Sequence, residues 1–405
     1  MTHAVRPWHT PMRGRDPDEP HRAATPLELF FDLCFVVAVA QAGIALHHEL
    51  AADHVTEGVI GYLMVFFAIW WAWMNFSWFA SAFDTDDVLY RLLTFVQIAG
   101  ALVIAAGVER AFVDLDYTVV AAGYLIMRIG LIAQWLRAAR EHPPLRGTAL
   151  RFAGGVAAIQ AGWLLRLALP EDLGNALFVP FVAIELAIPI WAERGSGPTP
   201  WHGGHIAERY GLFTIIVLGE SVLAASTALQ EAFAASGLSL GLITLAAGAL
   251  VLIGSMWWAY FKHNAAEEGD LHETNRQAFV WGYGHYFVFT SAAAVGAGLQ
   301  VAADLTHEEA AIGPVAAALA IAIPTAVYLL AGWLVNASGR SWRAIWPVLV
   351  TVGLILGVAV IVGGVNVPLA VLAMGVIVAG TVALTAYRWS RSASRKDASL
   401  AASSD

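Results

Sequence analysis

The chain is poor in the residues on which several protein classes depend. Only 13% of its 405 residues are charged, a single one is cysteine, and the formal net charge is -9. One cysteine, Cys34, excludes an internal disulfide and a cysteine-rich metal site, and the acidic balance excludes the basic surface of a nucleic-acid-binding protein. The sequence also has no phosphate-binding glycine loop that ends in lysine, which argues against an ATP-driven pump. We therefore expect no cofactor, no resident metal and no nucleic-acid partner.

Apolar residues dominate what is present. Hydrophobic residues make up 59% of the chain and its mean hydropathy is +0.65, too apolar for an ordinary water-soluble fold. A helix needs about 20 apolar residues to cross roughly 30 Å of hydrocarbon. The sequence therefore predicts an all-α, polytopic transmembrane helix bundle of about twelve spans, with the lipid bilayer as its main partner. The predicted spans are 27–47, 58–80, 91–112, 118–137, 149–169, 176–192, 210–229, 238–261, 278–301, 312–334, 345–363 and 367–388.

Basic residues alternate between the gaps that separate these segments. Nineteen of the twenty-two Lys and Arg residues fall in the tails or in every second gap, and cytoplasmic loops are the ones that retain Lys and Arg. Both termini are therefore predicted to be cytoplasmic. The proline-rich stretch before the first apolar segment is predicted to be a disordered tail.

The two halves of the chain resemble each other. The tract at 70–76, WWAWMNF, and the tract at 257–261, WWAYF, each end a long apolar segment and precede an acidic loop. This pattern favours two parallel six-helix repeats, an arrangement known in transporters. The alternative is that aromatic residues recur because both segments end at the same membrane interface. The predicted organisation is an N-tail at 1–26, a first half at 27–192, a linker at 193–209, a second half at 210–388 and a C-tail at 389–405.

A few charged residues lie at membrane depth, where each costs about 3 kcal/mol unless it is paired or hydrated. Glu28 and Asp32 are one helical turn apart and share a face, although a first-turn Glu28 also complements the helix dipole. Glu220 lies about ten residues into its segment, close to the midplane. Glu185 and Arg128 lie at comparable depths, so we predict an ion pair that is structural or functional.

Histidines are the other candidates. His285, in an apolar segment, could relay protons because imidazole titrates near neutral pH, or it could be a hydrogen-bonded core residue. The acidic loop at 263–273 matches no defined metal motif and is predicted to be a solvated surface, so no metal ligand is assigned.

Three stretches resemble a known family. They are the segment 26–36, PLELFFDLCFV, the aromatic tract at 70–83 with the acidic residues that follow it, and the segment 208–221, ERYGLFTIIVLGES. These motifs resemble the bacterial low temperature requirement A family over nearly all of residues 22–388, with Cys34 in place of a more usual valine. The resemblance implies a multispanning protein of the bacterial cytoplasmic membrane, from a family named for a cold-growth phenotype, and no particular reaction. The matching motif positions are Glu28, Asp32, Glu208, Arg209, Tyr210, Gly219, Glu220 and Ser221.

The leading hypothesis is a secondary transporter or permease for an unknown small solute or ion. A membrane-embedded enzyme, or enzyme partner, in lipid or envelope metabolism and a noncatalytic structural or sensory protein are the alternatives. The candidate binding or ion-coupling residues are Glu220, Asp32, Glu28, Ser221, His285, Glu208 and Arg209.

Overall fold

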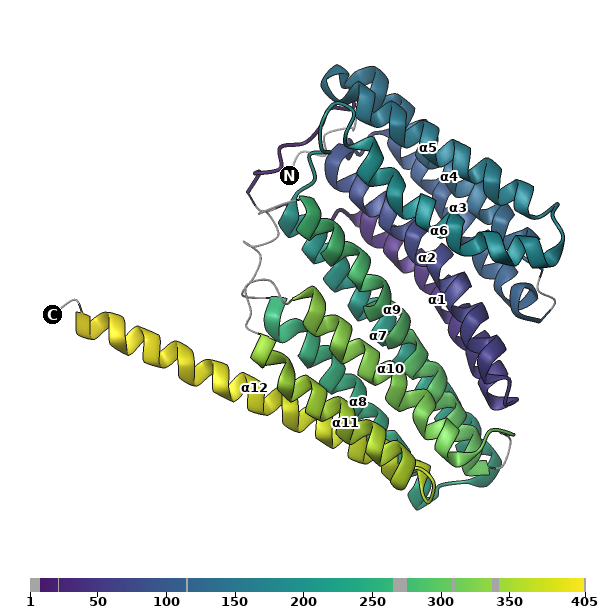
Figure 1. The fold of residues 1–405 in the computed structure, drawn as a ribbon, viewed down its shortest axis with the longest axis vertical. Coiled ribbons are helices and arrows are strands. Elements are labelled where there is room, and N and C mark those ends of the chain that lie inside the picture. Colours follow the sequence, from purple (N-terminus) through teal and green to yellow (C-terminus); the bar gives the residue numbers. More distant parts are fainter. Residues whose placement is uncertain are drawn as a thin grey trace. The chain divides into compact units, whose positions relative to one another are not determined.

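The described part of the chain is helical and contains no strand, which confirms the all-α class. A computed structural model describes residues 8–20, 22–113, 116–264, 275–307, 310–336 and 342–403 (Figure 1). The predicted acidic loop therefore lies largely outside the described residues. The α-helices in this part are α1 (Pro26–Ala51), α2 (Val55–Phe83), α3 (Val88–Val113), α4 (Thr118–Glu141), α5 (Arg146–Arg166), α6 (Glu171–Ala192), α7 (Gly203–Ser236), α8 (Leu240–Asn264), α9 (Asn275–Asp304), α10 (Pro314–Val335), α11 (Trp346–Ile361) and α12 (Val367–Ser403).

Each predicted span lies on one of these helices, and ten of the helices in the described residues are long and apolar enough to cross a membrane. The other two fall short for different reasons. α5 is not apolar enough, because Arg151 and Gln160 interrupt its apolar residues, and α11 has only 16 residues. A multispanning helical bundle is thus confirmed, with ten helices that meet the length and composition of a span.

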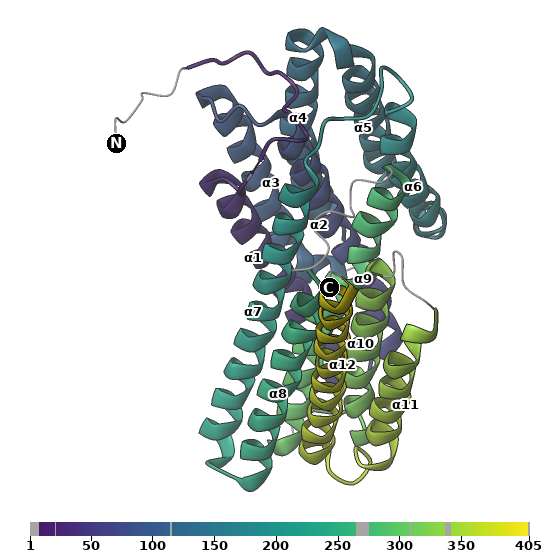
Figure 2. The ribbon, with the colours of Figure 1, turned by 90° about the vertical axis from the view of Figure 1, so that its left-hand side faces the viewer.

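The chain divides into two compact units. Unit 1 contains the described residues of 1–45 and 60–213, and unit 2 those of 46–59 and 214–405. In unit 1, α3 packs on α4, α4 on α5, and α5 on α6 (Figure 1). In unit 2, α8 packs on α12, α9 on α10, and α11 on both α10 and α12 (Figure 2). Helices α1, α2 and α7 contribute residues to both units.

Helices α3 and α4 approach each other closely at two glycines. A Cβ atom added to Gly123 would lie 2.6 Å from the Ile104 amide nitrogen and 2.7 Å from the Gly100 carbonyl oxygen. These neighbours are backbone atoms, which cannot rotate away. Small residues permit this backbone-to-backbone contact, which is common between membrane helices.

Gly123→Ala is therefore expected to lower the free energy of unfolding by about 1–3 kcal/mol, because the helices must separate to admit the methyl group. The measurement is the temperature at which half of the detergent-solubilised protein stops eluting as a monodisperse species. Gly154→Ala on α5 is the matched control, since a Cβ there meets nothing within 4 Å, and it should leave that temperature unchanged or raise it. Equal melting temperatures for the two variants would contradict the tight α3–α4 contact.

The N-terminal tail differs from its prediction. The sequence predicted disorder over 1–26, but residues 8–20 form an ordered segment. Met12 is 0% exposed, its amide donates to Glu141 Oε2 at 2.5 Å, and the Arg15 amide donates to the Ala82 carbonyl at 2.9 Å. Composition predicted disorder because the stretch has few apolar residues, whereas its order comes from acceptors at the ends of α2 and α4.

Asp87, just before α3, is a further acceptor for this segment. It accepts the Thr10 amide at 2.7 Å and the Arg137 guanidinium at 3.0 Å. Burial raises the pKa of Asp87, but hydrogen bonds from Arg137, Thr10 and Tyr90 outweigh it, so the pKa lies below its usual range. The charged form of Asp87 therefore anchors the N-terminal segment. At the other end of the chain, α12 continues through most of the predicted C-tail.

Candidate functional site

A fully buried charged cluster joins the start of α1 to the start of α7 within unit 1. Arg209 Nε donates to Asp32 Oδ2 at 2.9 Å, and Arg209 Nη1 lies 3.3 Å from Glu28 Oε1. A second Arg209 nitrogen, Nη2, also donates to Asp32. All three side chains are 0% exposed. One guanidinium thus lies between two carboxylates that are one helical turn apart.

Two further side chains complete this cluster. His205, one turn before Arg209 on α7, has its Nε2 atom 3.2 Å from Glu28, and Trp73 Nε1 on α2 donates to Asp32 Oδ1 at 2.7 Å. The Trp73 ring stacks on Phe213 with centroids 4.3 Å apart. We call Glu28, Asp32, His205 and Arg209 the acid–base cluster.

The start of α1 places Glu28 through local hydrogen bonds. The Glu28 amide donates to Thr25 Oγ1 at 3.3 Å, and the Thr25 amide donates to Glu28 Oε2 at 2.8 Å. This reciprocal arrangement is a capping box, which satisfies two donors at a helix start. Pro26 is the first residue of the helix, where its missing N–H costs nothing. The same carboxylate therefore fixes the helix start and belongs to the cluster.

Charges around the cluster cancel in pairs. Arg15 Nη2 lies 2.7 Å and Arg22 Nε 3.7 Å from Glu19, and Asp84 is a second buried carboxylate nearby. The hydrogen bond from Arg15 holds the pKa of Glu19 below its usual range. Tyr90, whose hydroxyl has no hydrogen-bond partner, is neutral. Two cations and two anions therefore surround the cluster and leave its own balance unchanged.

The cluster itself holds two carboxylates and one guanidinium. It carries one uncompensated negative charge unless a proton resides on His205 or on a carboxylate. An isolated buried charge costs several kcal/mol, so one proton on His205 or on a carboxylate would balance the cluster.

A second group of buried charged side chains in unit 1 joins α4 to α6. Arg128 Nη2 on α4 is 3.0 Å from Glu185 Oε2 on α6, and both residues are almost wholly buried. Trp71 Nε1 donates to Glu185 at 2.7 Å and Trp163 Nε1 at 3.1 Å. The Arg128 Nε and Nη1 atoms have no hydrogen-bond partner. We call Arg128 and Glu185 the α4–α6 ion pair.

The remaining predicted site residues lie elsewhere. Glu220 is half-buried on the part of α7 that belongs to unit 2, with no hydrogen bond or ion pair among the described residues. Ser221 Oγ donates to the Ala292 carbonyl at 2.9 Å. His285 Nε2 lies 3.0 Å from the Tyr260 hydroxyl, and His285 Nδ1 lies 2.8 Å from the Trp281 carbonyl oxygen.

Glu208 is exposed and accepts the Ala24 amide at 3.0 Å. The structure therefore brings together Glu28, Asp32 and Arg209, and leaves Glu220, Ser221 and His285 in the other unit. Cys34 follows Asp32 by two positions on α1 and is half-buried.

Sequence reasoning missed His205 and Trp73. The four-residue spacing of His205 and Arg209 places both on one face of a helix, and this was the available signal. Trp73 was noticed only as part of an aromatic tract. Among the described residues, no three His, Cys, Asp or Glu side chains gather as a metal site.

The motif residues now have a common location. A family model described as bacterial low temperature requirement A protein (LtrA) matches residues 23–386. The chain belongs to this family. Three of the LtrA motif positions named from the sequence, Glu28, Asp32 and Arg209, meet in the acid–base cluster.

The chain is also similar to the uncharacterized protein RA0937 of Rhizobium meliloti (strain 1021). The two are 27% identical over 291 residues, which cover 68% of this chain and 68% of that protein. No solved structure matches the chain. LtrA membership and the apolar helices together make this a multispanning bacterial membrane protein.

Proposed function

We propose that this protein is a secondary transporter of the cytoplasmic membrane, coupled to a proton that is exchanged at the acid–base cluster. The observation that carries the proposal is the charge balance of that cluster. Two carboxylates and one guanidinium, all 0% exposed, leave room for one proton beside His205. Buried ionisable residues in membrane proteins are costly, and proton relays are among their recurrent uses.

The position of the cluster supports a coupling role. It connects α1 to α7, and both helices contribute residues to unit 1 and to unit 2. When the proton is present, the His205 imidazolium pairs with Glu28. Arg209 then pairs with Asp32 alone. When the proton leaves, both carboxylates compete for Arg209, so the attachment of α7 to α1 weakens. Proton exchange thus acts on helices that the two units share.

The proposal includes two parallel repeats, each with a series of helices in which neighbours in sequence pack together. The series α3, α4, α5 and α6 packs in this way, and so does the series α9, α10, α11 and α12. In the proposed repeats, α3 to α6 of the first six-helix half correspond to α9 to α12 of the second. Parallel repeats of this kind occur in secondary transporters.

The test is proton flux in proteoliposomes that contain a pH-sensitive dye. A pH gradient is imposed, and the small-molecule filtrate of a bacterial extract is added outside to supply a co-substrate. Wild-type vesicles should dissipate the gradient faster than protein-free vesicles. Glu28→Gln removes the carboxylate that shares the proton and should return the rate to that of protein-free vesicles.

Glu231→Gln is the matched control, because Glu231 is exposed on the same α7 helix that carries His205, and it should behave as wild type. A Glu28→Gln protein that is monodisperse and yet transports protons at the wild-type rate would overturn the assignment to the cluster. Glu220→Gln is measured in the same series, because Glu220 is the other intramembrane carboxylate proposed to bind an ion. Loss of flux in Glu220→Gln alone would transfer the coupling site to Glu220.

A further inference from the structure

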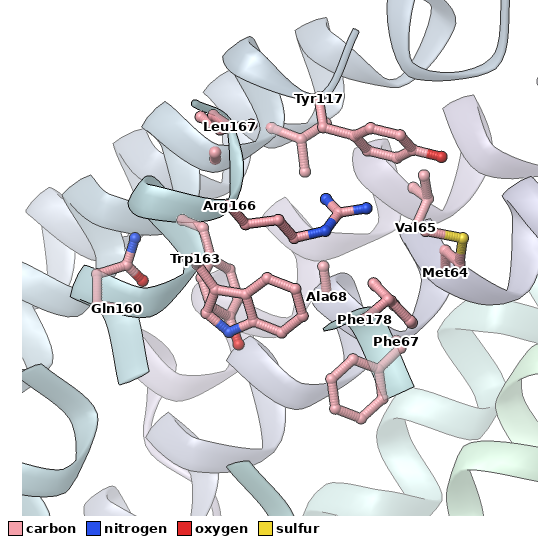
Figure 3. Close-up of a pocket in the computed structure, with 13 residues that line it drawn as sticks. Met64, Val65, Phe67, Ala68, Tyr117, Gln160, Trp163, Arg166, Leu167 and Phe178 are labelled. Carbon is pink, nitrogen blue, oxygen red and sulfur yellow. The ribbon is translucent and has the colours of Figure 1, made fainter. Parts of the chain in front are cut away.

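A cavity lies in unit 1, away from the acid–base cluster. Its volume is about 60 Å³, and its walls come from α2, α5, the starts of α4 and α6, and the residue before α4 (Figure 3). Apolar and aromatic side chains form most of the surface. Its polar contributors are Tyr117, Tyr124, Gln160, Trp163 and Arg166.

Arg166 gives this cavity a positive charge. It is the last residue of α5, and its Nε donates to the Gly174 carbonyl at 2.6 Å while its Nη2 donates to the Asn175 side chain at 3.2 Å. Both acceptors are neutral. No carboxylate among the described residues lies within ion-pair distance of Arg166, although the side chain is only 8% exposed. Among the described side chains, its charge therefore has no anionic partner.

Aromatic rings surround the same guanidinium. Its central carbon lies 5.5 Å from the Tyr117 ring centroid, 5.8 Å from that of Phe178 and 6.0 Å from that of Trp163. Figure 3 shows the Arg166 guanidinium between Tyr117 and Trp163. Ring faces stabilise the cation but cannot neutralise it, and they offer flat apolar walls to a ligand.

Gln160 is a second, independent sign of a binding site. It lines the cavity and is 3% exposed, yet neither its amide nitrogen nor its amide oxygen has a hydrogen-bond partner. A buried polar group left unpaired costs about 1–3 kcal/mol. A group that enters the cavity and bonds to this amide would remove that cost.

We infer that this cavity binds a small organic monocarboxylate. The carboxylate pairs with Arg166, which presents planar donors suited to that group, and the short apolar part packs against Phe67, Phe178 and Trp163. A single guanidinium without a second basic residue fits one negative charge better than a phosphate dianion. The volume holds only a few non-hydrogen atoms, because one water needs about 10–15 Å³ on this measure.

Two side chains that line the cavity also contact the α4–α6 ion pair. Trp163 lines the cavity and donates to Glu185, and Tyr124 lines it and contacts Arg128. A bound ligand therefore contacts side chains that hold the pair together. The inference goes beyond the proposed function, because binding here does not require transport.

The test is a calorimetric titration, in which butyrate is added to the purified protein in detergent and the heat of binding is measured. Butylamine, of similar size but opposite charge, and butyramide, which is neutral, are the comparison ligands, and inorganic phosphate is a further arm. Wild-type protein should bind butyrate at least about tenfold more tightly than any of the other three, since charge-assisted hydrogen bonds are the strong ones. Equal affinity for butyrate and butylamine, no binding of butyrate, or preference for phosphate would overturn the inference.

Substitutions test whether butyrate binds in this cavity. Arg166→Met should lower the affinity for butyrate by at least about tenfold. Arg151→Met is the matched control, because Arg151 lies on the same helix and its guanidinium stacks on the Trp191 ring at 5.4 Å, outside the cavity. Ala121→Leu fills the cavity without removing the charge and should also abolish binding, which keeps the test informative if Arg166→Met does not fold. Wild-type affinity in a monodisperse Ala121→Leu protein, or a phospholipid that copurifies in the cavity, would refute a small-anion site. Since no flux is measured, these results are independent of the proteoliposome test.

Discussion

Arg209→Met is expected to remove most of the folded protein. Arg209 is the only cation that contacts both Glu28 and Asp32 in the described structure, and all three are 0% exposed. Methionine would leave two carboxylates facing each other in a dry site. Truncating one partner of a buried ion pair costs about 3–5 kcal/mol, which is a large share of the 5–15 kcal/mol that typically stabilises a folded protein.

The measurement is the yield and thermal stability of monodisperse protein in detergent. Arg91→Met is the matched control, because the Arg91 side chain is 44% exposed in its pair with Asp86, and exposed pairs contribute only about 0–1 kcal/mol. A triple variant that adds Glu28→Gln and Asp32→Asn should recover part of the stability, since it removes the unpaired charges. If the single variant is as stable as wild type, Arg209 does not hold these carboxylates.

Glu185→Leu is also expected to lower the free energy of unfolding, by about 3–5 kcal/mol. The substitution removes the counter-charge of Arg128, which is 2% exposed, and it leaves the indole N–H groups of Trp71 and Trp163 without their acceptor. Arg128→Met alone should also destabilise the protein, because Glu185 then keeps neutral hydrogen-bond partners and no counter-charge.

The double variant tests whether Arg128 and Glu185 stabilise the fold as a pair or independently. If the two residues stabilise each other, Arg128→Met with Glu185→Leu should cost less than the sum of the two single variants by about 0.5–3 kcal/mol. Thermal stability in detergent supplies all four values of the cycle. Strictly additive losses would show that Arg128 and Glu185 contribute separately, in spite of their 3.0 Å contact.

The sequence predicted the helices well because a span is a local property. The length and composition of an apolar segment predict a helix without reference to the rest of the chain, so each of the twelve predicted segments coincides closely with a helix. The partner of Asp32, in contrast, depends on how distant helices pack. Arg209 is 177 positions away, and nothing in the local pattern tells which helix lies beside α1, so Arg209 was named only as a motif position.

Depth along a helix could also be counted from the sequence, but surroundings could not. Glu220 was placed near the midplane by counting residues, and such a count gives no information on what faces the side chain. His205 was overlooked for the opposite reason. It precedes the segment predicted from hydropathy, yet α7 begins at Gly203, so the histidine belongs to the helix and shares a face with Arg209.

The single thiol of the chain has a practical consequence. Cys34 is half-buried and lies on α1 two positions beyond Asp32, so the wild-type protein already carries a unique attachment point for a maleimide fluorophore or a nitroxide on the helix that holds Glu28 and Asp32. No cysteine has to be removed or introduced. Spectra of such a label recorded across a pH series would show how the surroundings of α1 respond to pH.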